Sequence, residues 1–136
     1  MIRFLDPSEI DERYRGLVRP GSSVGAAVSS AAQRHHYEGV TDLVELAATL
    51  LVRINEMHPR IDGNKRASVQ LCDEFLGLND HRLEGEPDKL AAFVWKVAQD
   101  RRRADAVEGL RAFVTEGAPA RPFDERYPEV IDDLAR

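Results

Sequence analysis

The chain is poor in several features that mark secreted, membrane-bound or nucleic-acid-binding proteins. It has one cysteine, Cys72, in 136 residues, so an internal disulfide is impossible and the disulfide framework of a small secreted domain is excluded. No apolar run approaches the roughly 20 residues that a membrane-spanning helix needs, and the first residues lack the apolar stretch of a signal peptide. Acidic residues outnumber basic ones, 24 to 19, which is the opposite of the balance expected for a protein that wraps nucleic acid. We therefore expect a cytoplasmic protein with no membrane anchor and no direct nucleic-acid binding.

The chain does contain enough apolar sequence for one folded domain. Hydrophobic residues make up 43% and charged residues 32%, which is typical of a globular protein and not of a disordered one. The length suits one core and is too short for two ordinary domains. The longest basic run, residues 101–103, stands between Asp100 and Asp105 and is interpreted as a solvated helix end.

Helical spacing of apolar residues recurs along the chain and predicts an all-α fold of about six helices. Helices are expected from Pro7 to a break at residues 19–23, then over 24–37, 42–58 and 64–78, from residue 87 onward, and over 105–114. Residues 17–24 and the piece around 82–83 are the strand candidates. From Gly117 the helical pattern fails. We expect one domain over residues 1–116 and a C-terminal tail over 117–136 that forms at most a short helix.

The helix over 42–58 has the clearest pattern. Thr41 is the expected N-cap, and Pro59 forces the helix to stop near His58 because the residue before proline disfavours helical geometry. The next helix is expected to begin at Asn64 and to end at Asn79 as a left-handed C-cap. A short polar corner, residues 58–66, therefore lies between two apolar helices.

That corner is predicted to bind an anion. The free backbone N–H groups and the dipole of a helix that begins at Asn64 favour negative charge, and Gly63 lets a phosphate approach the backbone closely. Lys65 and Arg66 lie in the first turn, where cations oppose the helix dipole. A bound polyphosphate would remove that conflict, with Arg66 gripping phosphate oxygens through its fork.

Two further residues give the corner a possible chemistry. Asp62 is placed for a magnesium ion that bridges phosphates, and His58 is the natural base for a neutral hydroxyl. Taken singly, each corner residue also has a purely structural interpretation as a turn, a cap or a solvated charge. The joint arrangement favours a functional interpretation, because cations in the first turn oppose the helix dipole and do not stabilise the helix.

Other chemically notable residues are interpreted as structural. The histidines outside the corner, His35, His36 and His81, do not show metal-ligand spacing, so a zinc site is not expected. Cys72 has the spacing of a core residue. The aromatic residues of the fifth helix, Phe93 and Trp95, are also expected in the core.

The segment His58-Pro-Arg-Ile-Asp-Gly-Asn-Lys-Arg66 resembles the motif of the Fic/Doc family, His-x-Phe-x-(Asp/Glu)-Gly-Asn-x-Arg. The resemblance runs from about Tyr37 to Asn79, and more weakly to Val114. Within the family the chain is most similar to the death-on-curing (Doc) toxins, which share the Asn-Lys-Arg form. The resemblance implies a compact helical Fic/Doc-like bundle with a small N-terminal flap hairpin.

The resemblance also implies a function, a toxin of a toxin–antitoxin module that phosphorylates a hydroxyl of elongation factor Tu with ATP and Mg²⁺ and stops translation. It implies that a cognate antitoxin binds in trans. Carried over residue by residue, it gives His58, Asp62 and Arg66 as catalytic residues, Gly63, Asn64, Lys65 and Arg66 as nucleotide ligands, and Asp62 as the metal ligand. An adenylyltransferase and a catalytically silent antitoxin-binding module remain the alternatives.

Three positions differ from patterns within the family. Arg60 replaces the motif Phe, so we expect its side chain either to turn outward or to meet an acidic partner. Val69 stands where adenylylating members carry a second Arg, which favours phosphoryl transfer, whereas Gly63 matches those members better than the original Doc, which has Ala. The internal inhibitory pattern (Ser/Thr)-x-x-x-Glu-(Gly/Asn) is absent from the sequence, which favours inhibition by a separate chain.

Overall fold

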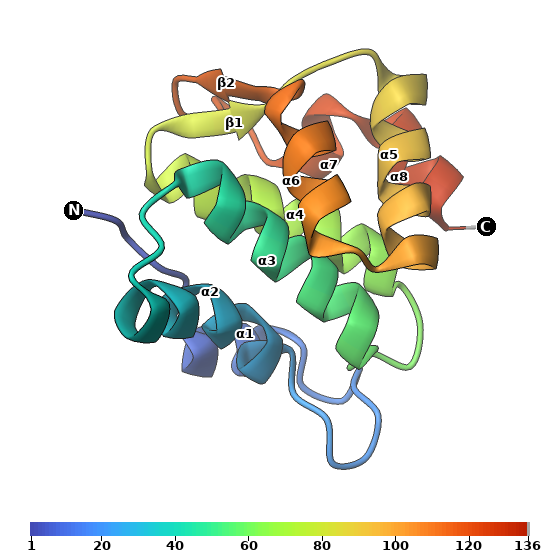
Figure 1. Ribbon diagram of the computed structural model, residues 1–136. Coiled ribbons are helices and arrows are strands. Elements are labelled where there is room, and N and C mark those ends of the chain that lie inside the picture. Colours follow the sequence, from blue (N-terminus) through green and yellow to red (C-terminus); the bar gives the residue numbers. More distant parts are fainter. Residues whose placement is uncertain (136) are drawn as a thin grey trace.

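The computed structural model describes residues 1–135, which fold as an all-α bundle with one small two-stranded sheet (Figure 1). Within this range the helices are α1 (Pro7–Arg13), α2 (Val24–Glu38), α3 (Leu43–Met57), α4 (Asn64–Leu78), α5 (Pro87–Asp100), α6 (Arg103–Arg111), α7 (Phe123–Arg126) and α8 (Pro128–Leu134). The strands are β1 (His81–Leu83) and β2 (Val114–Glu116). No helix in residues 1–135 is long and apolar enough to cross a membrane.

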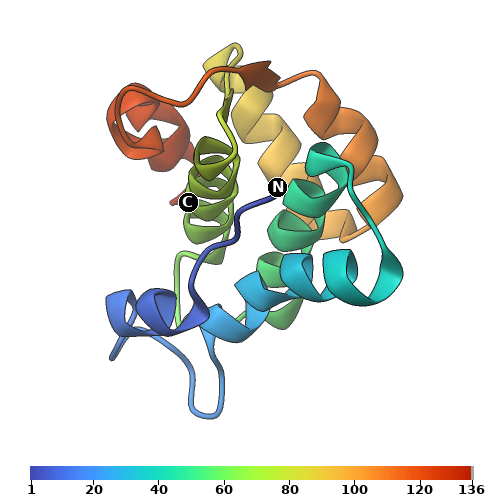
Figure 2. The same ribbon diagram turned by 90° about the vertical axis from the view of Figure 1, so that its left-hand side faces the viewer.

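Helices α3 and α4 form the centre of the bundle. Figures 1 and 2 show α1 and α2 on one side of this pair and α5 to α8 on the other. The apolar stripe of α3 is completely buried at Leu46, Leu50 and Ile54, and α4 contributes Leu71 and Phe75 to the same core. Removal of this apolar surface from water is the main force that holds the pair together. The corner between α3 and α4 therefore connects two helices that are firmly packed in the core.

Capping residues explain several helix boundaries. Asp42, and not the expected Thr41, is the N-cap of α3, because its carboxylate accepts a hydrogen bond from the N–H of Val44. Gly39 ends α2 in the left-handed conformation. The prediction of a left-handed Asn79 was wrong: Asn79 has φ −112°, and the left-handed residue is Asp80 at φ 61°.

The N-terminal segment differs from the expected hairpin. Helix α1 ends at Arg13, and residues 14–23 form a loop in which the N–H of Arg19 donates to the carbonyl of Pro59 (2.8 Å). The N–H of Ile61 donates to the carbonyl of Leu17 (3.2 Å), and Val18 pairs with Arg60 in a single antiparallel bridge. Within the loop only turns form, such as the one closed by the Ser22 N–H on the Arg19 carbonyl (3.0 Å), and its strand-like pairing is with the motif corner.

The small sheet joins segments that are far apart in the sequence. Strand β1 agrees with the candidate at residues 82–83, and it pairs antiparallel with β2, with Leu83 opposite Val114. The prediction of helix over residues 105–114 was wrong at its end, because α6 stops at Arg111 and Val114 belongs to β2. The pairing satisfies backbone groups that no local pattern could have assigned.

The segment after Gly117 forms two helices, α7 and α8, where at most one short helix was expected. They pack on α4 and α5 through buried Phe123, Val130 and Leu134. Arg126 on α7 forms an ion pair with Asp73 on α4, and only 15% and 3% of these side chains are exposed. A buried pair of this kind ties the end of the chain to the central helix.

Candidate active site in the corner between α3 and α4

The corner begins where α3 ends at His58. His58 is the C-cap of α3 with φ 52°, a left-handed conformation that is uncommon for residues other than glycine. Its N–H still donates to the carbonyl of Ile54 (3.1 Å), and its own carbonyl accepts a bond from Arg19 Nη1 (3.1 Å). The backbone is held on both sides, while the side chain is exposed.

The side chain of Asn64, at the start of α4, holds the loop through two hydrogen bonds to the backbone of Arg60. Its Oδ1 accepts a hydrogen bond from the Arg60 N–H (2.9 Å), and its Nδ2 donates to the Arg60 carbonyl (3.1 Å). The side chain is buried, so these two bonds fix the loop shape from inside. Both ends of the amide are therefore engaged by the protein backbone.

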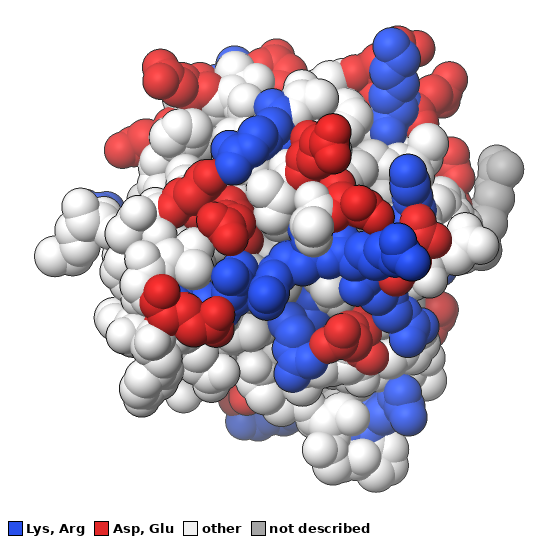
Figure 3. Space-filling view, viewed as in Figure 1, with Lys and Arg blue, Asp and Glu red and all other residues white. Residues whose placement is uncertain are grey.

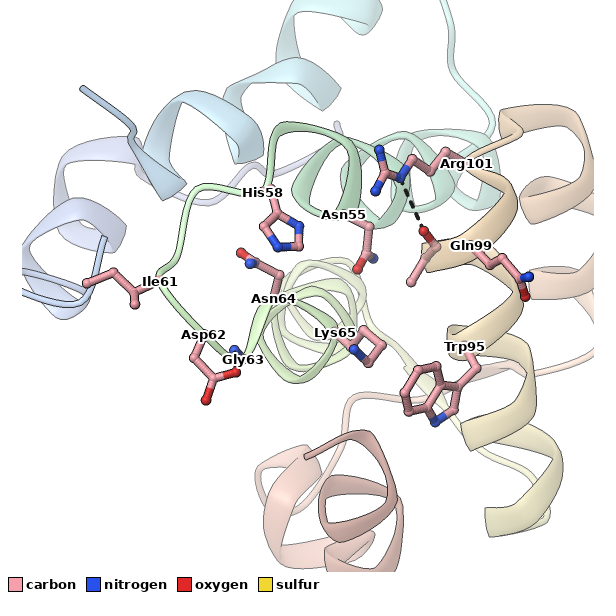
Figure 4. A pocket seen from close by; sticks show the side chains of 11 residues that line it. Asn55, His58, Ile61, Asp62, Gly63, Asn64, Lys65, Trp95, Gln99 and Arg101 are labelled. Atoms are coloured by element: carbon pink, nitrogen blue, oxygen red, sulfur yellow. Dashed lines mark hydrogen bonds between the residues drawn. The ribbon is translucent and has the colours of Figure 1, made fainter. Parts of the chain in front are cut away.

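A pocket of about 500 Å³ opens beside this corner, between the end of α3, the start of α4 and one face of α5 (Figure 4). That volume is in the range of small-molecule sites. The residues that line it are Asn55, His58, Ile61, Asp62, Gly63, Asn64, Lys65, Trp95, Ala98, Gln99 and Arg101. Three of these side chains can carry positive charge, and Asp62 is the one carboxylate among them.

The structure brings five of the six predicted site residues to this pocket: His58, Asp62, Gly63, Asn64 and Lys65. Figure 4 shows His58 over the start of α4 and Lys65 on the flank of that helix that faces α5. The carboxylate of Asp62 is 89% exposed, and one of its oxygens accepts the Gly63 N–H (2.8 Å).

Arg66 does not line the pocket. Its Nη2 lies 3.7 Å from Asp62 Oδ2, a weak ion pair, and its Nε is buried without a hydrogen-bond partner. The guanidinium lies close to Gly63 and to the guanidinium of Arg60, since a Cβ added at Gly63 would meet both groups. The predicted fork to phosphate would therefore require a change in the Arg66 side chain.

Arg60, which replaces the motif Phe, contacts an aromatic ring that was not expected as its partner. Its guanidinium lies over the ring of Tyr14 at 5.0 Å, and its Nη1 donates to the Gly63 carbonyl (3.4 Å). The expectation of an outward turn or an acidic partner was wrong, because the face of an aromatic ring attracts the cation instead. Burial raises the pKa of Tyr14, and the neighbouring charge of Arg60 partly offsets that rise.

Gly63 has a local reason to be glycine. Its φ is 80°, and a Cβ would lie 2.8 Å from Arg66 Nη2 and 3.0 Å from Arg60 Nη1. The left-handed backbone therefore disfavours any side chain here, whereas the two guanidinium groups are ends of flexible side chains that could move.

Six residues of the pocket wall were not predicted as site residues: Asn55, Ile61, Trp95, Ala98, Gln99 and Arg101. Asn55 is buried one turn before His58 and donates to the Leu51 carbonyl (2.9 Å). The prediction that Trp95 lies in the core was wrong, since it is 37% exposed. A polar residue on the apolar stripe of α3 could have indicated Asn55, but no local signal connects α5 with the corner.

The basic run at residues 101–103 is exposed as predicted, but it is not merely a solvated end. Arg101 caps α5 in the left-handed conformation at φ 54° and lines the pocket, where its Nε donates to the Ala98 carbonyl (3.2 Å). Figure 3 shows Lys and Arg side chains in a band across this face, interrupted by acidic residues. The band lies over the C-terminal half of α3 and the turn between α5 and α6.

The site thus combines a polar corner in a helical bundle, a histidine at the end of one helix and cations at the start of the next. The chain belongs to the Fic/DOC family, whose model matches residues 6–76, from the start of α1 almost to the end of α4. No curated protein matches the chain. Members of the family in general use a nucleoside triphosphate and a divalent metal. Membership supports a protein-modifying transferase as the general function of this chain.

Proposed function

We propose that this protein is a Doc-type toxin that transfers the γ-phosphoryl group of ATP to a hydroxyl of a translation factor in the cytoplasm, with elongation factor Tu as the first candidate. The observation that carries the proposal is the distribution of charge on α4. Lys65, in the first turn, faces the pocket, whereas Val69, where adenylylating relatives have a second Arg, is buried in the core. A corner of this kind lacks the residue that holds the outer phosphates in the adenylylating pose.

His58 is proposed as the general base. The target hydroxyl gives its proton to the His58 ring while its oxygen bonds to the γ-phosphorus. The bond from that phosphorus to the bridging oxygen breaks, and ADP leaves with the electron pair. The exposed ring of His58, on a backbone held by Ile54 and Arg19, can reach a hydroxyl presented from outside the pocket.

The polyphosphate is proposed to bind at the start of α4. Free N–H groups of the first turn, the ammonium of Lys65 and the guanidinium of Arg101 supply complementary charge. Asp62 fits a magnesium ion, because its carboxylate is exposed and magnesium commonly uses one carboxylate together with phosphate oxygens. A bound magnesium ion would neutralise part of the phosphate charge. Asn64 supports this site through the loop, since its amide already bonds to Arg60.

Gly63 does not weigh against phosphoryl transfer. In the sequence it was the residue that favoured AMP transfer, because adenylylating relatives share it. Its left-handed backbone, with φ 80°, gives a local reason for glycine that is independent of the reaction. Likewise, the contact of Arg60 with Tyr14 gives the loop an anchor, which supports an active enzyme over a silent module.

Regulation is proposed to come from a separate antitoxin, since family members are in general regulated in this way. Expression of the protein alone should then arrest growth, and co-expression of the antitoxin should restore it. Harmless expression of soluble, enzymatically active protein would contradict this part of the proposal.

The transfer type is tested with ATP labelled at either the α or the γ phosphate, purified elongation factor Tu, and mass spectrometry of the product. An added phosphate supports the proposal, and an added AMP refutes it. His58→Ala is the matched control and should lower the rate by about 10²–10⁴ without loss of the fold. If neither label is transferred to any protein of a cell extract, the silent antitoxin-binding module is the better description.

A further inference from the structure

Trp95 makes a contact with Lys65 that the family motif does not describe. The Lys65 ammonium lies over the indole ring at 4.3 Å from its centroid. Trp95 lies on α5, outside the residues 6–76 that match the family model. Figure 4 shows the ring on the α5 side of the pocket, facing the lysine across the start of α4.

The indole is itself held from the C-terminal segment. Its Nε1–H donates to Asp133 Oδ1 on α8 (3.1 Å). Helix α8 is anchored by buried Val130 and Leu134, so the orientation of the ring depends on the packing of the last helix. Asp133 on α8 therefore contacts Trp95 on α5, and Trp95 in turn contacts Lys65 on α4.

An aromatic partner has a specific advantage for a lysine that binds an anion. A free lysine side chain samples many rotamers, and fixing it needs an attractive partner. A carboxylate would fix it but would also cancel its charge. Within residues 1–135 no carboxylate lies within ion-pair distance of Lys65, and Asp62 is paired weakly with Arg66 instead. The ring face attracts the ammonium and leaves its full charge available.

We propose that Trp95 is a positioning residue that holds Lys65 in the pocket for a nucleoside polyphosphate, and that α8 sets the ring through Asp133. The inference rests on the proposed function, because it assigns the nucleotide to this pocket. It extends the functional unit beyond the family-matched region to the last helix of the chain. Trp95 acts through Lys65 and has no part in the transfer step itself.

The test is a double-mutant cycle on nucleotide binding. Trp95→Leu should weaken the affinity for a non-hydrolysable ATP analogue with Mg²⁺, measured by calorimetry, by about two- to tenfold. Trp95→Phe keeps a ring and should recover most of that loss. In a Lys65→Met background, Trp95→Leu should have almost no further effect, since the residue through which it acts is gone. In turnover assays the loss should appear in KM for ATP more than in kcat.

Tyr37→Leu removes an exposed aromatic residue of α2, remote from the pocket, and should leave binding unchanged. Equal weakening by Trp95→Leu with and without Lys65 would overturn the inference while leaving the proposed function intact. A wild-type protein that binds no nucleotide would overturn both.

A second measurement does not depend on a Trp95 variant that folds. Trp95 is the single tryptophan of the chain, so its fluorescence reports this site alone. Loss of the ammonium in Lys65→Met should shift or rescale the emission of the nucleotide-free protein. Identical emission spectra of the wild type and Lys65→Met would show that the contact is absent and would overturn the inference.

Discussion

Replacement of Arg126 by methionine should strongly destabilise the protein, because it leaves a carboxylate buried without its partner. The Asp73 side chain is 3% exposed, and Arg126 is its ion-pair partner in residues 1–135. The same guanidinium donates to the carbonyls of Leu83 and Arg121, both at 2.9 Å. Methionine keeps an apolar stem of similar length, so the substitution removes mainly charge and hydrogen bonds.

The size of the effect follows from the burial. Breaking a buried ion pair by removing one partner costs about 3–5 kcal/mol. Asp73 keeps its bond from the Leu83 N–H (2.9 Å), which favours the lower end, so we expect a loss of about 3 kcal/mol. For a protein of this size that loss corresponds to a fall in Tm of roughly 10 °C.

Urea unfolding followed by circular dichroism measures the free energy of unfolding. Arg121→Met changes an exposed arginine of the same segment and should shift the free energy of unfolding by less than about 0.5 kcal/mol. The double variant Asp73→Asn with Arg126→Met should lose less than Arg126→Met alone, because the buried charge is gone while an acceptor for Leu83 remains. A loss below about 1 kcal/mol for Arg126→Met, or strictly additive effects, would refute the reasoning.

Burial raises the pKa of the Cys72 thiol, so maleimide should label Cys72 at pH 8 only after unfolding in guanidinium, and rapid labelling of the native protein would contradict this. The hydrogen bond from Arg111 lowers the pKa of Asp42, so this pair stabilises the fold at neutral pH and loses its contribution as the pH falls below the ordinary Asp value of 3.8. Asp42→Asn, which keeps an N-cap, should therefore be less stable than wild type at pH 7, and the gap should narrow as the pH falls from 3.8 toward the lowered pKa of Asp42; a gap that does not narrow in acid would count against the pair. Arg60→Ala and Tyr14→Leu should show a coupling of about 0.5–2 kcal/mol in a double-mutant cycle of urea unfolding, and no coupling would mean that the stacked contact contributes nothing.

Much of the central architecture could be predicted from the chain alone, because the signals are local. A buried stripe with a period of 3.6 residues identified the helices over 42–58 and 64–78 to within a residue or so of α3 and α4. Pro59 and Gly63 likewise marked the corner between them. A helix is made of contacts three and four residues apart, so its sequence contains most of the information about where it begins and ends.

The sequence did not show which elements pair or pack with one another. Strand β2 was not predicted, and its first residue, Val114, was predicted as the end of a helix. Three residues carry little pattern, and their pairing with β1 joins positions about 30 apart in sequence. Helices α7 and α8 follow a Gly- and Pro-rich stretch and are short, so propensity alone would not stabilise them. Their stability comes from packing on α4 and α5, which only the folded chain provides.

The candidate site likewise has features that follow from local sequence and features that depend on tertiary packing. Most residues of the corner could be predicted from the sequence, because the positions from His58 to Lys65 are close along the chain and the order of helix end, loop and helix start brings them together. Three features could be seen only in the tertiary structure. Arg66 does not line the pocket, the Arg60 guanidinium lies over the ring of Tyr14, and α5 completes the pocket wall with Trp95 and Arg101. The physical reason is that side-chain direction and contacts between distant segments depend on how helices pack, which is a property of the whole core and not of any local stretch of chain.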